Sequence, residues 1–125
     1  MEVREIMTPN PEYLPTTCTI SEAARKMQEL DVGFLPIGDK KTDKLVGTLT
    51  DRDIVVSCLA KGKDLSTPVQ SIMHKGVLYC FENDDIKKAT RYMKDHQIRR
   101  LIVLNKNKRL TGVLSLADLE KISKH

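Results

Sequence analysis

The sequence GTLTDRD at residues 47–53 returns in altered form as GVLSLAD at residues 112–118. Each stretch places a hydroxyl residue before an aspartate with two residues between them. The two pairs are Thr50 with Asp53 and Ser115 with Asp118. An apolar run that ends in such a pair is typical of a strand followed directly by a helix, because the hydroxyl and the carboxylate can cap the first helical turn. The chain therefore contains the same strand-to-helix junction twice.

The duplication extends outward from these junctions over most of the chain. Identical residues lie 66 positions apart before the loop at residues 40–44 and 65 positions apart after it. The matched pairs include Val3 and Val69, Met27 and Met93, Leu35 and Leu101, Gly47 and Gly112, and Asp53 and Asp118. A copy of about 60 residues is marginal as an independent domain, so we expect the copies to share one core and fold as one pseudo-two-fold module. The predicted organisation is a first motif at residues 1–62, a linker at 63–71 and a second motif at 72–125.

Apolar spacing predicts the same elements in each copy. In the first copy we expect a short strand at 13–15, a helix at 20–30 with a Thr19–Glu22 capping box, strands at 32–37 and 45–49, and a helix at 51–60. In the second copy we expect strands at 79–81, 98–104 and 110–114, a helix at 86–93 and a helix from residue 116. Met27 and Met93 are expected in the core. The predicted fold class is α/β (α+β), built from two β-α-β-β-α units.

Composition limits the class of protein. The chain has 125 residues, of which 40% are hydrophobic and 30% charged, as expected for one folded globular domain. Its longest apolar runs are far shorter than the roughly 20 residues of a membrane helix, and its start has no signal-peptide pattern, so we expect a cytoplasmic protein. The three cysteines and three histidines lack the spacing of disulfide, zinc or redox sites. Motifs of known catalytic centres are also missing, which predicts a protein that is not an enzyme and has neither catalytic residues nor a metal site.

The two Thr/Ser-x-x-Asp pairs have a structural and a functional interpretation. They can serve only as helix caps. The same geometry can also bind a ligand, because free N–H groups and a hydroxyl at a helix start receive phosphate while a carboxylate accepts both hydroxyls of a ribose. On the functional interpretation, Gly33 and Gly47 would let the ligand approach the backbone closely.

Charge is divided unevenly and suggests an alternative function. Residues 1–65 carry 9 Lys and Arg against 11 Asp and Glu, a net −2, whereas residues 66–125 carry 12 against 6, a net +6. The second half could bind an anionic partner. Nucleic-acid binding is the main alternative, through basic residues on one helix and in one turn: Lys87, Lys88, Arg91, Lys94, Lys106, Lys108 and Arg109. A merely solvated helix face is the simpler explanation, because Trp is absent and only five Tyr and Phe could stack on bases.

The ordered set of motifs resembles a known family, the tandem cystathionine-β-synthase (CBS) motifs that form a CBS pair or Bateman module. In the first copy the resemblance rests on residues 3–8 (VREIMT), 20–27 (ISEAARKM), 32–37 (VGFLPI) and 45–54 (LVGTLTDRDI). In the second copy it rests on residues 72–73 (IM), 98–103 (IRRLIV) and 112–119 (GVLSLADL). Each motif alone is weak, but their order occurs twice and covers essentially the whole chain.

The resemblance implies a stand-alone regulatory module, packed sheet to sheet, that binds AMP, ADP, ATP, NAD or S-adenosylmethionine in the cleft between the motifs. It assigns ribose to Asp53 and Asp118, and phosphate or ribose to Thr50, Ser115, Arg52, Arg99 and Arg100. It assigns adenine to the backbone around Thr17, Cys18, Phe34, Leu35 and Pro36. The nucleotide would be a regulatory ligand, no cofactor would be required, and a protein target would respond to the bound state.

Two further expectations concern assembly and asymmetry. The helix at 51–60 is too apolar to leave one polar face, which indicates a homodimer that covers it and its counterpart in the second copy. The copies also differ near the predicted ligand, since Arg99 replaces Gly33 and Ala117 replaces Arg52. The two sites are therefore expected to be inequivalent.

Overall fold

A computed structural model describes residues 1–123, and the chain divides into two compact units. The first-repeat unit is Glu12–Val77, and the second-repeat unit combines Met1–Pro11 with the residues from Leu78 onward. These units do not coincide with the predicted motif boundaries, because the first eleven residues pack with the second repeat. Each repeat nevertheless has the predicted β-α-β-β-α order.

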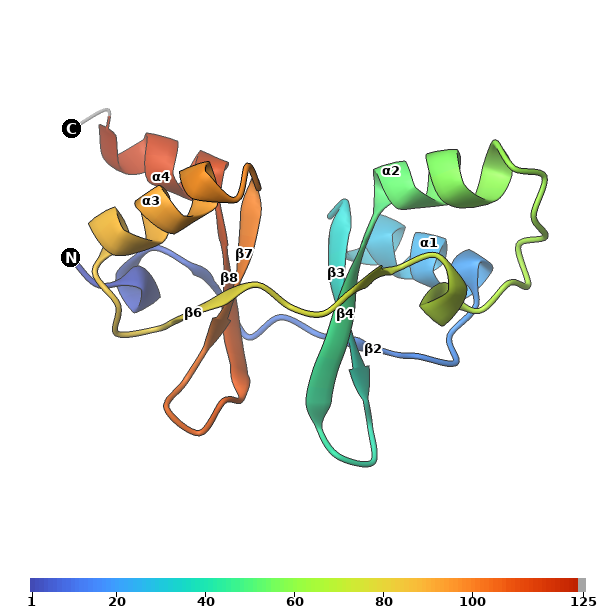
Figure 1. Ribbon diagram of the computed structural model, residues 1–125, viewed down its shortest axis with the longest axis horizontal. Helices are drawn as coiled ribbons and strands as arrows, with labels where there is room; N and C mark the ends of the chain where they lie inside the picture. Colours follow the sequence, from blue (N-terminus) through green and yellow to red (C-terminus); the bar gives the residue numbers. More distant parts are fainter. Residues whose placement is uncertain (124–125) are drawn as a thin grey trace. The chain divides into compact units, whose positions relative to one another are not determined.

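The first-repeat unit contains a mixed four-stranded sheet in the order β2-β3-β4-β5 (Figure 1). Strand β2 (Leu14–Pro15) is parallel to β3 (Phe34–Asp39), while β4 (Lys44–Thr50) is antiparallel to both β3 and β5 (His74–Lys75). The predicted hairpin is confirmed, although β3 begins and ends two residues later than expected. Strand β5 was missed because two residues show no periodicity.

Helix α1 (Ile20–Leu30) connects β2 to β3 and begins with the predicted capping box. The Thr19 hydroxyl accepts a hydrogen bond from Glu22 N at 3.2 Å, and Glu22 Oε1 accepts one from Thr19 N at 3.1 Å. The helix ends at Asp31, whose left-handed φ of 55° stops the helical path. Its buried face presents Ile20, Ala23 and Met27 to a core with Leu35, Ile37 and Leu49, which confirms Met27 as a core residue.

The helix expected at 51–60 has two parts. A short α2 (Asp51–Asp53) continues into a π-helix, η2 (Ile54–Leu59), in which Ala60 N donates to Val55 O across a wider turn. Ile54 and Cys58 face the core, whereas Val55, Val56 and Leu59 are 44–55% exposed. The chain leaves this helix at Gly62, which has a φ of 70°.

The second-repeat unit has a matching sheet in the order β1-β8-β7-β6 (Figure 1). Strand β6 (Tyr79–Phe81) is parallel to β7 (Arg100–Leu104), and β8 (Leu110–Ser115) is antiparallel to both β7 and β1 (Thr8–Pro9). Helices α3 (Ile86–Asp95) and α4 (Leu116–Ser123) complete the unit. Its core contains Met93, as predicted, together with Val3, Leu101, Val103 and Leu114. The expectation of one shared core is wrong, because each unit buries its apolar residues in a cluster of its own.

The segment that leads into each repeat completes the other repeat's sheet. Residues of η1 (Val3–Glu5) and β1 precede the first repeat but belong to the second-repeat unit. Residues of η3 (Val69–Ser71) and β5 precede the second repeat but belong to the first-repeat unit. The segment predicted as a linker is therefore tied to the first repeat, where Val69 is fully buried and its N–H donates to Cys18 O at 2.8 Å.

Within residues 1–123, no helix is both long and apolar enough to cross a membrane. Cys18, Cys58 and Cys80 are buried free thiols. Burial raises the pKa of the Cys18 thiol, and it raises the pKa of Cys80 to about 12.

Candidate functional site

Both Thr/Ser-x-x-Asp pairs form reciprocal caps at the start of a helix. Thr50 N donates to Asp53 Oδ2 at 2.8 Å, and Asp53 N donates to Thr50 Oγ1 at 3.1 Å. Ser115 N donates to Asp118 Oδ2 at 2.9 Å, and Asp118 N donates to Ser115 Oγ at 3.1 Å. The capping interpretation is thus confirmed in both repeats, and it engages one oxygen of each carboxylate.

The two aspartates are unusual for their burial. Asp53 is 8% exposed and Asp118 is 9% exposed, and no other charged residue of the described chain is buried. Withdrawing a carboxylate from water is costly unless hydrogen bonds and a favourable local field compensate it. A helix start supplies both, because its N–H groups point at the carboxylate. Each repeat therefore holds one preorganised anionic acceptor.

The register of the strands shows which predicted residues share a sheet face with the capping hydroxyls. Phe34 on β3 lies directly opposite Thr50 on β4. In the same way, Arg100 on β7 lies directly opposite Ser115 on β8. Directly opposite residues of an antiparallel pair point to the same side of a sheet. We call this side the outer face, because the intervening residues, such as Leu35 and Leu101, point into the cores.

Arg99 and Arg100 have different surroundings, although both are exposed. Arg100 begins β7 on the outer face beside Ser115. Arg99 precedes the strand, and its carbonyl accepts a hydrogen bond from Leu116 N at 3.0 Å. The structure thus brings Arg100, rather than Arg99, onto the face that carries the capping hydroxyl. Arg52 lies on the exposed side of α2, next to Asp53.

The residues assigned to adenine differ in accessibility. Thr17 is exposed and Phe34 is half-buried. Cys18 and Leu35 belong to the core of the first-repeat unit, and Pro36 is fully buried. Their side chains are therefore withdrawn from the surface, so a ligand at these three positions could use only backbone groups.

The expectation that Gly47 leaves room for a ligand is wrong. A Cβ at Gly47 would collide with the carbonyl oxygen of His74, because β5 packs against β4 at this point. The equivalent Gly112 is crowded by Met7 and by Thr8 O of β1. Glycine at these two positions lets β5 pair closely with β4 and lets β1 pair closely with β8.

The exchanged strands add two residues that sequence reasoning missed. His74 lies opposite Thr48, and its Nε2 is 3.0 Å from Asp53 Oδ1. Thr8 lies opposite Val113 in the matching position of the second-repeat unit. The offset of 66 between Thr8 and His74 was available as a signal, but the pairing of two-residue strands was not.

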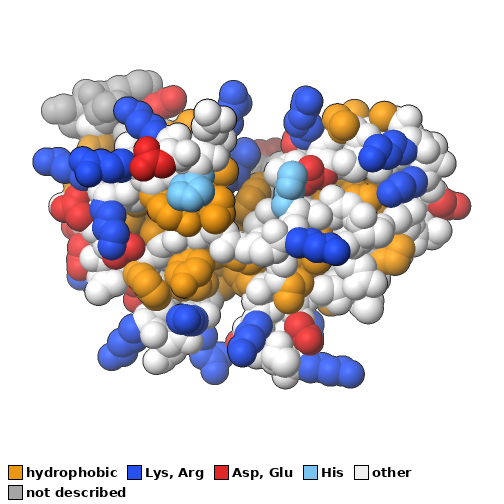
Figure 2. Space-filling model, in the orientation of Figure 1, with side chains coloured by type: hydrophobic (Ala, Val, Ile, Leu, Met, Phe, Trp, Pro, Cys, Tyr) orange, Lys and Arg blue, Asp and Glu red, His pale blue; other side chains and the backbone are white. Residues whose placement is uncertain are grey.

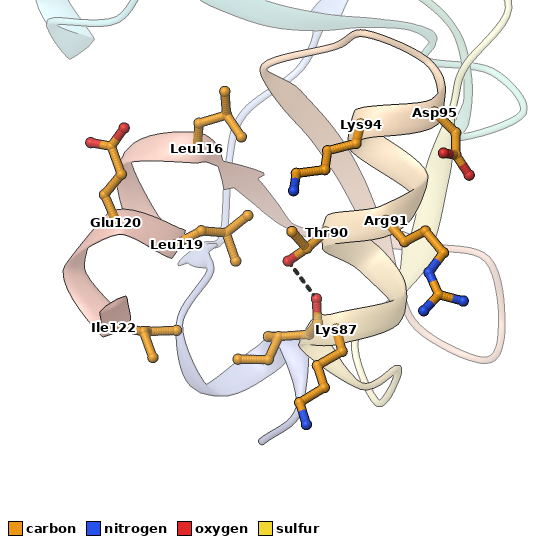
Figure 3. A pocket seen from close by; sticks show the side chains of 10 residues that line it. Lys87, Thr90, Arg91, Lys94, Asp95, Leu116, Leu119, Glu120 and Ile122 are labelled. Atoms are coloured by element: carbon orange, nitrogen blue, oxygen red, sulfur yellow. Dashed lines mark hydrogen bonds between the residues drawn. The ribbon is translucent and has the colours of Figure 1, made fainter. Parts of the chain in front are cut away.

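A groove separates α3 from α4 in the second-repeat unit (Figure 3). Leu116, Leu119 and Ile122 of α4 point toward α3, which contributes Lys87 and Lys94. Thr90 uses its hydroxyl within α3, donating to Ile86 O at 2.6 Å. The α4 wall of the groove is therefore mostly apolar, and the α3 wall is mostly polar and carries three basic residues.

The basic residues of α3 that were considered for nucleic acid have acidic neighbours. Lys87, Arg91 and Lys94 line the groove together with Asp95 and Glu120. Lys88 lies 3.8 Å from the Asp84 carboxylate. On the face drawn in Figure 2, Lys and Arg side chains are spread over both units and interrupted by apolar areas.

Metal-ligating side chains are dispersed. Among residues 1–123, no group of three or more His, Cys, Asp or Glu is placed to hold a metal ion. The His74–Asp53 pair by itself provides two ligand types but not a coordination sphere.

Comparison with known proteins places these features in a family. The CBS domain model matches residues 3–59 and 69–125. Hypoxic response protein 1 of Mycobacterium tuberculosis is 37% identical over 120 residues, which is 94% of this chain and 82% of that protein. The crystal structure of Hypoxic Response Protein I with two coordinated zinc ions has a TM-score of 0.84 at 34% identity and covers 97% of this chain and 98% of that one.

Two similar structures contain adenosine compounds. The CBS domain protein PAE2072 from Pyrobaculum aerophilum, complexed with AMP, has a TM-score of 0.87 at 28% identity, and each chain is covered completely, at 100%. The CBS domain pair of protein MJ0100, in complex with 5′-methylthioadenosine and S-adenosyl-L-methionine, has a TM-score of 0.87 at 25% identity and covers 98% of this chain and 99% of that one. With both repeats matched by the family model, the chain belongs to the CBS domain family as a tandem CBS pair, or Bateman module.

Proposed function

We propose that this CBS pair is a non-catalytic regulatory module whose two capped aspartates bind the ribose of adenosine-containing ligands. The observation that carries the proposal is the pair of buried carboxylates, Asp53 and Asp118, each held at a helix start beside a hydroxyl residue. A carboxylate whose second oxygen is not used by the cap can accept hydrogen bonds from a ribose diol. The complexes of PAE2072 with AMP and of MJ0100 with 5′-methylthioadenosine support adenosine as the shared ligand chemistry.

The neighbours of the two carboxylates favour different ligands. Phe34 beside Thr50 offers an aromatic ring in the first-repeat unit, whereas Arg100 beside Ser115 offers a cation in the second-repeat unit. A guanidinium interacts strongly with phosphate. We therefore expect phosphorylated ligands such as AMP to prefer the Ser115–Asp118 site. The nucleotide acts as a regulatory signal, which a cytoplasmic partner protein reads from the conformation of the module.

We further propose that the chain forms a homodimer through its apolar helices. Val55, Val56 and Leu59 are exposed on η2, and Leu116 is 38% exposed on α4. A second copy would remove this apolar surface from water, and an isologous contact is the commonest way to do so. The apolar α4 wall of the groove in Figure 3 suits such a helix contact better than it suits a phosphate backbone, so we favour a dimer over the nucleic-acid alternative.

A thermal-shift panel tests the adenosyl proposal. The panel contains AMP, ADP, ATP, NAD, S-adenosylmethionine and 5′-methylthioadenosine, with GMP and inorganic phosphate as controls. A ligand that binds only the folded state at one hundred times its Kd adds about 2.7 kcal/mol, which raises Tm by several degrees. We expect a response to at least one adenosyl compound and a smaller response to both controls. No response to any adenosyl compound at millimolar concentration contradicts the proposal.

A further inference from the structure

His74 reaches the first-repeat site from outside that repeat. It lies on β5, which the leading segment of the second repeat contributes to the sheet of the first-repeat unit. Its position opposite Thr48 puts it on the outer face, the same side as Thr50, and Gly47 lets β5 approach closely enough for this contact. The sheet itself therefore positions the imidazole over the helix start.

The imidazole uses the one oxygen of Asp53 that the cap leaves available. Asp53 Oδ2 accepts the hydrogen bond from Thr50 N, while Oδ1 lies 3.0 Å from His74 Nε2. The Asp53 side chain is 11% exposed, but the His74 side chain is 70% exposed, so the ring can leave without disturbing the core. A ribose that binds Asp53 must compete for the same oxygen.

We infer that His74 is a displaceable latch on Asp53, which a bound ribose replaces and which makes binding at this site depend on pH. The inference rests on the proposed ribose role of Asp53. His74 acts here as a positioning residue, since it affects the ligand through the carboxylate. In the second-repeat unit Thr8 occupies the position equivalent to His74, and its side chain cannot acquire a positive charge.

The direction of the pH effect follows from the charge of the pair. The charged residues on β5 and on the elements packed against it are Lys75, Lys44, Asp51, Arg52 and Asp53, of which Asp53 contacts the ring. Histidine side chains gain a proton between about pH 8 and pH 5, and a protonated imidazole holds a carboxylate more strongly than a neutral one. Acidification should therefore tighten the latch and weaken ribose binding at Asp53.

The test uses an uncharged ligand, so that attraction between a protonated histidine and a phosphate cannot contribute. Calorimetry with 5′-methylthioadenosine is carried out at pH 5.5 and pH 8.0 on Asp118→Asn, in which only the first-repeat site remains intact. The comparison adds His74→Thr, which copies Thr8, and His74→Gln, which keeps an uncharged N–H donor. The second-repeat site is measured on Asp53→Asn, with and without Thr8→His.

We expect binding at the first-repeat site to weaken roughly twofold to fivefold on acidification, the range of a solvent-exposed ion pair. His74→Thr and His74→Gln should abolish this pH dependence, and His74→Thr should bind more tightly at pH 5.5. Thr8→His should introduce the same dependence at the second-repeat site.

The failures of the two proposals are distinguishable. If the parent protein binds none of the adenosyl compounds in the thermal-shift panel, the ribose function and the latch are both wrong. If 5′-methylthioadenosine binds with the same affinity at both pH values, or the pH dependence survives His74→Gln, only the latch is overturned. A variant that loses its cooperative thermal transition is replaced by the other His74 variant.

Discussion

The carboxylate of Asp51 fills the space beside Gly33. A Cβ on Gly33 would lie 2.7 Å from Asp51 Oδ2, and Asp51 N donates to Gly33 O at 2.9 Å. In the second repeat the equivalent residues are Leu116 and Arg99, joined by the same backbone hydrogen bond at 3.0 Å. Where the first repeat has Gly33 next to Asp51, the second repeat therefore has Arg99 next to Leu116.

We predict that Gly33→Ala changes the free energy of unfolding by less than about 1 kcal/mol, because the Asp51 carboxylate ends an exposed side chain and can move away from the new methyl group. That movement gives up the hydrogen bond from Arg52 N to Asp51 Oδ1. Gly47→Ala is the contrasting variant and should cost more, because its Cβ would meet the backbone carbonyl oxygen of His74. Urea denaturation measures all three proteins, and a larger loss for Gly33→Ala than for Gly47→Ala contradicts the prediction.

We predict that Asp53→Asn and Asp118→Asn separate ligand binding from helix capping. An amide keeps one acceptor oxygen, so the cap should lose only a fraction of a kcal/mol. A charge-assisted hydrogen bond to ribose is worth about 1.5–3 kcal/mol, so affinity at the altered site should fall roughly tenfold to hundredfold. Asp51→Asn, at the exposed start of α2, is the matched control. Calorimetry should show parental affinity for this control, and parental affinity for all three variants would leave capping as the only role.

We predict that Val3 stabilises the second repeat although it precedes the first. Val3 is fully buried in the core with Leu101 and Leu114, so Val3→Ala should cost about 2 kcal/mol. Hydrogen exchange should then accelerate in β7 and β8. Val69→Ala is the matched change in the other core and should accelerate exchange in β3 and β4. Faster exchange in β3 and β4 after Val3→Ala would contradict the observed strand exchange.

We predict that Cys80 resists alkylation in the folded protein. Burial raises its pKa to about 12, so almost no thiolate is present at pH 8. Unfolding returns the thiol to its ordinary range, and the folded state therefore loses stability as pH rises from about 9 toward 12. Mass spectrometry after iodoacetamide treatment should find Cys80 modified only in denaturant. Rapid modification under native conditions would show that the site opens frequently.

We predict that Val56→Glu disrupts the proposed dimer. A carboxylate in an apolar helix contact would have to be desolvated, so light scattering at micromolar concentration should shift from dimer mass to monomer mass. Leu65→Glu is the control, because Leu65 is comparably exposed but lies outside the helix. A parent protein that is already monomeric at this concentration contradicts the dimer.

Local patterns in the sequence predicted the larger elements well. Thr19 and Glu22 identified the start of α1 because a capping box is a local signal, and Met27 was assigned to the core from its spacing. The hairpin of β3 and β4 followed from two apolar runs and a polar turn. In each case the interacting residues are near one another in sequence, so a local sequence pattern is enough to predict the element.

The site depends on contacts that no local pattern contains. Strands β1 and β5 are too short to show a periodic pattern in the sequence. Gly47 is required because β5 packs closely against β4 at this position, and that pairing could not be predicted. His74 is an exposed histidine far from Asp53 in sequence, so nothing in its neighbourhood indicated their contact.

The exchange of leading segments makes the chain cross between its two units twice, once at residues 11–12 and again at residues 77–78. The units are therefore held by two covalent tethers instead of one. A protease that cuts near Leu78, which is 42% exposed, leaves the tether at residues 11–12 intact. Nicked protein should migrate as two fragments in denaturant yet elute as one species under native conditions, and only a second cut can release a unit.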